Sequence, residues 1–552
     1  MNSPLPLQQI ILGFFLVSSL TGCMPGGVSA RTADGLPSGT ELPQQPAVKT
    51  TGDDLSVQYL WLDPAIPQSF LTSWRVPEGW EETAELAKAD AKLAIYADLQ
   101  PSPAVCRDWT LALTAPFPTV LDSVGTKSVR DFWQSAKTTV DFPVSTLLVD
   151  EEIENMLKAI WGEADPASPV QIMAQQDQVD FAWQKENVFA LVPFDQLDPR
   201  WKVIQLGGRS PLKRDLAKDY PLNFKICLSM VNSQTVPSEF NLPSGNRDED
   251  KMTIVALTGT TAPVRGTAYQ MEMEGLTFPA EKLAGLLSQA DITHISNEVP
   301  LYEACPPAVP LRREARFCGK PAYLELFQKI GVDVIELTGN HVMDWGSDAF
   351  LETLDLYERE NVPYYGGGKD ATQAAIPWKI SDHGNRLVFL GCNSVGPEAA
   401  WAKKDAPGAR KCDFDELALE IASYKSEGYL PIVTLQDFEY ELIPPASIQR
   451  ANFRAAALAG AVLVSGSQAH NAQGFRFYDQ TLVHYGLGNL FFDQTFKNNR
   501  PALIDMHVFY DQRFLGTELI TITMPDSLQP QLMTQREREK FLTKVFAESE
   551  WK

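Results

Sequence analysis

The sequence predicts an α/β protein with two domains. Its 552 residues are too many for one hydrophobic core. Short apolar runs typical of strands alternate with amphipathic helical segments in both halves, and the apolar positions of Glu151–Trp161 recur at helical spacing. A polar, turn-rich segment at 237–251 separates the halves. We therefore expect an α/β domain at 55–236, a linker at 237–251, a second domain at 252–500 and a C-terminal extension at 501–552.

The first 54 residues predict export and a lipid anchor. The apolar run Ile10–Leu20 is too short to cross a bilayer, which needs about 20 residues. It leads into Leu-Thr-Gly before Cys23, which is the lipobox pattern, although no Lys or Arg precedes the run. We expect residues 1–23 to be a lipoprotein signal peptide ending at an acylated Cys23, residues 24–54 to be a flexible tether, and the protein to lie on the extracytoplasmic face of the cell membrane. A non-lipidated signal is the alternative.

The cysteine count agrees with export. Seven cysteines less the acylated Cys23 leave six, an even number, and disulfides persist outside the cytosol. No Cys-x-x-Cys spacing indicates a zinc site. Sequence alone leaves the connectivity open, and six buried thiols are the alternative. The plausible pairs are Cys106 with Cys227, Cys305 with Cys318, and Cys392 with Cys412.

The charge excludes one class of function. The chain has 47 basic and 70 acidic residues, a formal net charge of -23. Proteins that bind nucleic acid need clustered Lys and Arg, so we expect no nucleic-acid partner. The net charge also gives no long-range attraction for any other polyanion.

The first domain contains no catalytic motif. Leu93–Tyr96, Val188–Pro193 and Phe224–Leu228 are the predicted strands. The segments Ala190–Phe194 and Asp219–Leu222, placed behind a lipoprotein tether, loosely resemble extracytoplasmic solute-binding domains. The alternative is a docking module without a ligand.

The second domain consists of repeated strand and helix units, which predict sheets flanked by helices. Ser347–Glu360 carries its apolar residues on one helical face. Phe278–Ala290 is also predicted to be helical, between strands that begin at Thr253 and Ile292.

Polar loops follow four of these predicted strands, where α/β proteins bind their ligands. Asn340 and His341 offer an amide oxygen and an imidazole nitrogen, both suited to a divalent ion, and Gly339 lets the backbone turn. A purely structural histidine is the alternative. The four loops are Gly259–Thr261, Ser296–Glu298, Thr338–His341 and Ser465–His470.

These loops and the segments around them resemble one family. From about Thr253 to Gln494 the sequence is similar, in order and spacing, to the CapA family of poly-γ-glutamate capsule biosynthesis proteins, in the calcineurin-like metallophosphoesterase superfamily. The matching blocks are Asn297–Pro300, Ile335–Gly368, Val433–Tyr440, Val464–His470 and Tyr485–Gln494.

The resemblance implies an α/β/β/α sandwich preceded by the smaller solute-binding-like domain. It also implies a site in which two divalent ions, Mn, Fe or Zn, polarise a phosphate ester and activate water. By resemblance, Glu298 takes the place of the bridging carboxylate and His470 that of a metal ligand. Asn340 would bind metal and substrate, and His341, in the same metal site, would protonate the leaving group.

Three positions depart from the family pattern. Thr260 stands where the family has Asp, and Gln436 and Gln468 stand where it has His. The remaining residues lack the ligand charge of a two-ion site. The candidate supporting residues are Asp344, Asp437, Glu439, Thr260, Gln436 and Gln468.

Two functions therefore follow from the sequence. The favoured one is a binding or weakly catalytic CapA-like protein that holds an anionic polymer such as poly-γ-glutamate, or its synthase complex. The alternative is an active metal-dependent hydrolase of a phosphoester or a polymer amide.

Overall fold

A computed structural model of the chain describes residues 57–98, 104–232, 235–310, 315–438, 442–494 and 499–551. The predicted signal peptide, Cys23, the tether and Glu439 lie outside these residues. Within the described ranges, no helix has both the length and the apolar character needed to cross a bilayer.

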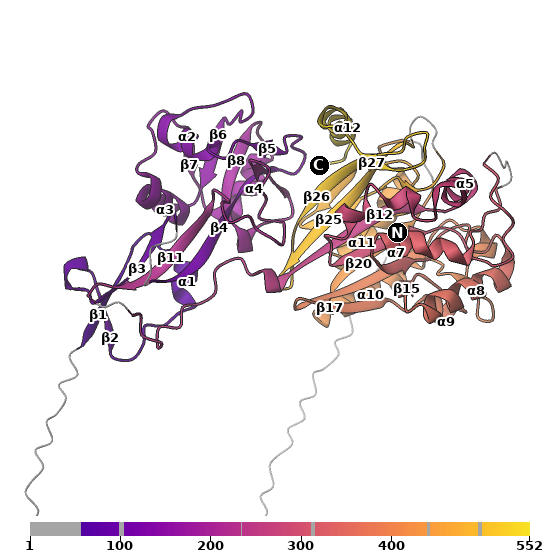
Figure 1. Cartoon of the computed structure of the whole chain (residues 1–552), viewed down its shortest axis with the longest axis horizontal. Coiled ribbons are helices and arrows are strands. Elements are labelled where there is room, and N and C mark those ends of the chain that lie inside the picture. The colour runs from indigo at the N-terminus through magenta and orange to yellow at the C-terminus, as the bar shows by residue number, and fades with distance from the viewer. Residues whose placement is uncertain are drawn as a thin grey trace, which may run out of the picture. The chain divides into compact units, whose positions relative to one another are not determined.

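The first domain is built on a nine-stranded mixed sheet (Figure 1). The strand order is β2-β1-β3-β11-β4-β8-β6-β7, and β9 pairs with β4. The short strands β5 (Ser123–Val124) and β10 (Gln205–Leu206) form a separate pair. The sheet strands are β1 (Gln58–Leu62), β2 (Trp80–Thr83), β3 (Ala91–Tyr96), β4 (Ala104–Pro116), β6 (Thr146–Val149), β7 (Val170–Ile172), β8 (Val188–Pro193), β9 (Trp201–Val203) and β11 (Asn223–Met230).

Among the described residues of this domain there are four α-helices, and α3 (Glu151–Trp161) has the predicted bounds. It begins where the Asp150 carboxylate accepts the Ile153 amide at 2.8 Å, and it ends at Gly162, whose φ of 85° favours glycine. Its apolar face packs into the core of the domain. The other helices are α1 (Gln68–Thr72), α2 (Ser128–Ser135) and α4 (Gln175–Ala182).

The second domain contains two large sheets. The first has the order β15-β14-β13-β12-β25-β26-β27, with β24 beside β12, and the second has the order β17-β18-β20-β21-β23-β22. Residues 501–532, predicted as an extension, supply strands β25 to β27 of the first sheet. The strands are β12 (Met252–Thr261), β13 (Ile292–Asn297), β14 (Val332–Glu336), β15 (Tyr364–Tyr365), β17 (Trp378–Asp382), β18 (Asn385–Asn393), β20 (Leu430–Gln436), β21 (Leu463–Ser465), β22 (Phe475–Tyr478), β23 (Thr481–His484), β24 (Asn489–Phe491), β25 (Pro501–Tyr510), β26 (Arg513–Thr523) and β27 (Gln531–Leu532); β16 (Gly367–Gly368) and β19 (Gly408–Ala409) form a further pair.

The two sheets pack face to face, with helices on both outer sides. Alternate residues of β12 show this arrangement, because Val255 and Leu257 join a core shared with Phe389 and Ile432 of the second sheet. Ile254 lies in the other core, which contains apolar residues of α5, α7 and α8. Helices α10 and α11 cover the outer face of the second sheet. The domain is therefore the predicted α/β/β/α sandwich.

The helices of this domain agree with prediction except in one segment. Helix α8 (Gly346–Arg359) forms as expected, whereas Phe278–Ala290 is broken into a 3-10 turn at Phe278–Ala280 and the short α6 (Ala284–Leu287). The predicted long helix there is wrong, and Pro279 and Gly285 are poor residues for a helix interior. The remaining helices are α5 (Arg265–Glu274), α7 (Leu324–Lys329), α9 (Ala371–Ala374), α10 (Phe414–Ser426), α11 (Ser447–Ala459) and α12 (Gln535–Ala547).

Three disulfides join the predicted cysteine pairs. Cys106 and Cys227 lie directly opposite each other in β4 and β11 and are 121 residues apart in sequence. The other bridges, Cys305–Cys318 and Cys392–Cys412, span 13 and 20 residues. Since a disulfide restricts the unfolded chain more when it closes a longer loop, the first bridge has the largest expected effect on stability.

We expect replacement of Cys106 and Cys227 by Ala to lower the free energy of unfolding by about 5 kcal/mol. The matched pair Cys305→Ala and Cys318→Ala should cost about 3 kcal/mol, because its loop is shorter. Urea denaturation followed by tryptophan fluorescence measures both losses. A larger loss from the shorter loop would contradict the loop-length argument.

Candidate functional site

The carboxyl ends of the central strands bring the predicted loops together at one edge of the sandwich. β12, β13 and β14 run parallel in one sheet, and β18, β20 and β21 run parallel in the other. Thr260 lies opposite Ser296 on one side and Asn489 of β24 on the other. The register therefore places Thr260 beside the start of the Glu298 loop.

Glu298 and His470 come into direct proximity at this edge. His470 Nε2 lies 3.9 Å from Glu298 Oε1, and both side chains are buried. The other ring nitrogen, Nδ1, lies 2.8 Å from Oδ1 of Asn489. An amide oxygen only accepts hydrogen bonds, so Nδ1 carries a proton and Nε2 is directed toward the carboxylate. Asn489, which the sequence did not single out, thus orients His470.

Asn340 and His341 lie on the adjoining loop. The Gly339 backbone packs against Glu298 so closely that a Cβ at position 339 would lie 2.7 Å from the Glu298 Cα. Asn340 Oδ1 is buried and has no hydrogen-bond partner among the described residues. His341 Nδ1 lies 2.7 Å from Asp344 Oδ2, and this contact fixes the orientation of the ring.

An aromatic pair lies between the two histidines. The His341 ring is 4.6 Å from that of Phe317, the His470 ring is 5.1 Å from that of Phe492, and the two phenylalanines are 6.2 Å apart. The Arg265 guanidinium lies over both phenylalanine rings, at 4.7 and 5.2 Å. These contacts place His341 and His470 in one neighbourhood, and neither phenylalanine was predicted to take part.

The three positions that depart from the family pattern are fully buried. Thr260 Oγ1 donates to the Ser467 carbonyl at 3.4 Å, and the Gln468 amide donates to the Ser296 hydroxyl. Gln436 ends β20, and neither atom of its side-chain amide has a partner among the described residues. A buried amide without a partner costs about 1–3 kcal/mol, so water or a ligand is expected there.

The candidate supporting acids Asp344 and Asp437 already accept hydrogen bonds from protein groups. Asp344 accepts the Phe317 amide at 2.7 Å in addition to binding His341. Asp437 accepts the Asn452 side chain at 2.8 Å, and burial raises its pKa. Glu439 lies outside the described residues.

A buried carboxylate beneath the loops was missed by the sequence analysis. Glu336 ends β14, is fully buried, and pairs with His294 at 3.3 Å. It also accepts Thr338 Oγ1 at 2.5 Å and the Ser467 hydroxyl. Burial alone would raise the pKa of Glu336, but these hydrogen bonds and the neighbouring imidazole hold its pKa below the usual value. An acidic residue at the carboxyl end of a strand, three residues before the Gly-Asn-His loop, was the available signal.

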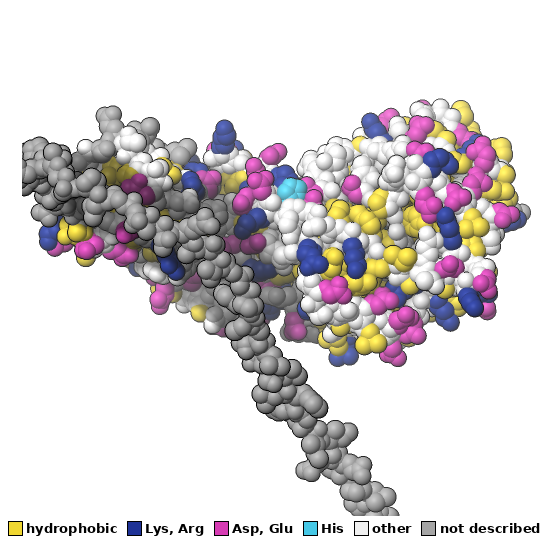
Figure 2. All heavy atoms as spheres, turned by 90° about the horizontal axis from the view of Figure 1, so that it is seen from below, with side chains coloured by type: hydrophobic (Ala, Val, Ile, Leu, Met, Phe, Trp, Pro, Cys, Tyr) yellow, Lys and Arg dark blue, Asp and Glu magenta, His cyan; other side chains and the backbone are white. Residues whose placement is uncertain are grey.

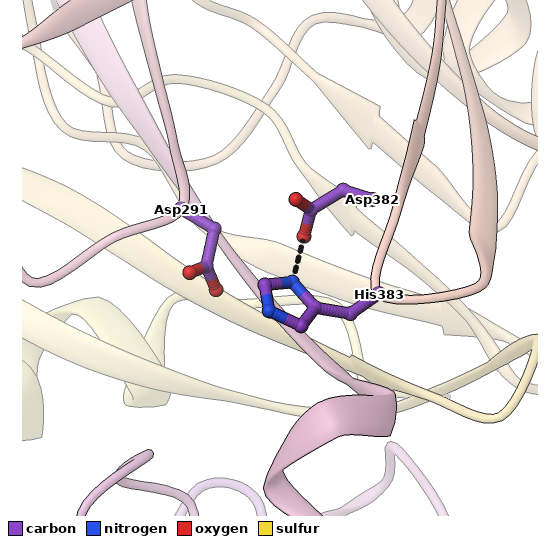
Figure 3. Close-up of side chains that lie close together, drawn as sticks. All are labelled: Asp291, Asp382 and His383. Carbon is purple, nitrogen blue, oxygen red and sulfur yellow. Dashed lines mark hydrogen bonds and ion pairs between the residues drawn. The ribbon is translucent and has the colours of Figure 1, made fainter.

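A second cluster of possible metal ligands lies at the opposite edge of the sheets. Figure 3 shows Asp291, Asp382 and His383 directed toward one another, with His383 Nδ1 2.7 Å from Asp382. The Arg214 guanidinium already occupies this cluster, donating to Asp291 at 2.5 Å and lying 3.3 Å from His383 Nε2. Asp291 also accepts the Ile254 amide at 2.7 Å. A fixed cation and backbone donors thus satisfy the carboxylate, which identifies a structural ion-pair network.

The two-sheet sandwich with polar loops at its carboxyl edge defines a metallophosphoesterase-like domain. Residues 254–494 match the family model of the bacterial capsule synthesis protein PGA_cap. The second domain therefore belongs to the CapA family.

Curated relatives agree with this assignment. The chain is 26% identical over 208 residues to the capsule biosynthesis protein CapA of Bacillus anthracis, which covers 37% of this chain and 50% of the relative. It is 28% identical over 192 residues to the PGA biosynthesis protein CapA of Bacillus subtilis, covering 34% and 49%. The chain thus spans about half the length of the curated relatives it matches. Among solved structures, a 5'-nucleotidase precursor from Thermus thermophilus aligns with a TM-score of 0.32 at 11% identity, covering 53% of this chain and 58% of that one.

We expect Glu336→Gln to lower the free energy of unfolding at pH 7 by about 3 kcal/mol, because it breaks a buried and hydrogen-bonded pair. The depressed pKa of Glu336 stabilises the folded chain above the unfolded-state value of about 4.3. That stabilisation is lost as pH falls through the lower folded-state pKa, so the difference between variant and parent should shrink in acid. Denaturation at pH 7 and pH 3 measures it; a constant difference would contradict this role for Glu336.

Proposed function

We propose that this chain is a lipid-anchored envelope protein of poly-γ-glutamate or capsule-type polymer biosynthesis. Its second domain would bind an anionic polymer, or the synthase that makes it, at the edge formed by Glu298, Asn340, His341 and His470. The CapA assignment of residues 254–494 supports the process. The lipobox at Cys23 supports the location. The net charge of -23 favours a partner other than nucleic acid.

One observation favours binding over hydrolysis. At three positions where the family has charged or imidazole ligands, this chain has Thr260, Gln436 and Gln468, all buried at the same edge. Thr260 and Gln468 donate to protein acceptors, and both glutamines are neutral and poor ligands for Zn, Mn or Fe. The donor set does not fit a two-ion centre. It retains one carboxylate, two imidazoles and the amide oxygen of Asn340.

What the site retains supports the alternative, an active hydrolase. His341 is oriented by Asp344, and His470 by Asn489, as in sites that transfer protons or hold an ion. Glu298 lies beside His470. A single divalent ion, Mn, Fe or Zn, bound by these residues would supply Lewis-acid chemistry to a phosphoester or amide.

Metal content separates the two functions. We expect the purified chain, incubated with Mn²⁺ or Zn²⁺ and desalted, to retain well under about two ions per molecule, because three ligands are replaced. Plasma emission spectrometry gives the stoichiometry. The variant Thr260→Asp with Gln436→His and Gln468→His should retain more. About two tightly held ions on the unaltered chain would instead establish the hydrolase.

His341 gives a second test. If the chain retains any ion or weak esterase activity, His341→Ala should reduce it at least about tenfold, because a positioned proton donor or ligand is lost. His383→Ala is the matched control, since His383 lies in the Arg214 network at the opposite edge. Equal effects of both substitutions would remove His341 from the proposed site.

A further inference from the structure

A large groove in the first domain has no role in the function proposed above. Its volume is about 1430 Å³, and its walls come from β4, α2, the segment 206–225 with the start of β11, and residues 244–249. Sites for small ligands usually measure about 300–1,000 Å³. The groove is therefore large enough for several units of an extended chain.

Basic side chains gather in this groove although the protein as a whole is strongly acidic. On the face in Figure 2, acidic and basic side chains are interspersed, without a broad field of one sign. The groove contains seven basic and five acidic residues, an excess of two positive charges. The basic residues are Arg107, Lys127, Arg130, Arg209, Lys218, Lys225 and Arg247; the acidic ones are Asp98, Asp108, Asp219, Asp248 and Glu249.

Two of the seven cations are neutralised by acids within the groove. Arg209 forms a two-pronged pair with Asp219 at 2.8 and 2.5 Å, and Lys225 pairs with Asp108. Among the described residues, no carboxylate lies within ion-pair distance of the other five cations.

Two of those five cations are held rigidly by backbone carbonyls. Arg107 donates to the carbonyls of Cys106, Leu242 and Pro243, and Arg247 donates to those of Pro211, Lys213 and Arg214. Carbonyl acceptors fix a guanidinium without cancelling its charge.

The remaining three cations, Lys127, Arg130 and Lys218, are exposed at the groove. Lys127 and Arg130 lie at the start of α2, three residues apart, so their side chains can both face the same ligand. Arg130 hydrogen-bonds only the neutral Gln134 side chain among the described partners. These three flexible cations are available to pair with anions that enter the groove.

We propose that this groove binds a segment of a polycarboxylate chain. Fixed Arg107 and Arg247 provide positive charge at the wall, and Lys127, Arg130 and Lys218 pair with successive carboxylates. The volume favours a polymer segment over a single anion. The choice of a polycarboxylate rests on the proposed function; the positive charge of the groove does not.

Binding of fluorescently labelled poly-γ-glutamate to the full chain, measured by anisotropy at low ionic strength, tests the proposal. The variant Lys127→Glu with Arg130→Glu should bind about tenfold more weakly, because two attractive contacts become repulsive. The matched control is Lys404→Glu with Lys540→Glu, which makes the same charge change at exposed positions outside the groove. We expect the control to bind within about twofold of the parent.

Four results would overturn the proposal. Equal weakening in variant and control would show a general charge effect. Unchanged binding in the groove variant would place the polymer elsewhere on the chain and leave the proposed function intact. Competition by millimolar inorganic phosphate, at matched ionic strength, would show a small-anion site. If the unaltered chain binds no polymer, the groove proposal fails, and the metal measurements decide the proposed function separately.

Discussion

The close contact between the Gly339 backbone and Glu298 determines the geometry of the second-domain site. A side chain at position 339 would need space that the Glu298 Cα already occupies, at 2.7 Å. Any larger residue would push the loop after β14 away from the loop after β13. Asn340 and His341 would then move away from Glu298 and His470. The meeting of these four residues thus depends on the parallel register of two strands and on the absence of one side chain.

Protein groups satisfy the buried polar side chains beneath this contact. Glu336 is fully buried, as Glu298 is, and its oxygens are occupied by His294, Thr338 and Ser467. Thr260 is neutral, and its hydroxyl needs only one hydrogen-bond acceptor, which is the Ser467 carbonyl. An Asp at that position would add a further buried negative charge with a large desolvation cost unless a cation neutralised it.

Local and periodic features of the fold could be predicted from sequence, whereas features made by distant partners could not. The Glu151–Trp161 helix follows from side-chain spacing, and the strand predicted from Thr253 lies within β12; both match the structure. Glu336 escaped attention because its partner Ser467 is 131 residues away. The groove of the first domain was missed for the same reason, since its cations lie on separate elements. In the second domain, the resemblance to a family made up for this lack of information on distant contacts. It placed Glu298 and His470 in one site before any distance was known.

The groove and the net charge of the chain act over different distances. At physiological ionic strength, exposed charges are screened beyond about 8 Å, so the charge of -23 slows the approach of a polyanion only near the surface. Inside the groove, Lys127, Arg130 and Lys218 pair with carboxylates at contact distance, where attraction is strongest. A lipid anchor at Cys23 would hold the groove close to polymer emerging at the membrane and so raise its effective concentration. Proximity to the membrane would then bring the polymer to the groove despite the net negative charge of the chain, and the cations of the groove would hold the polymer there.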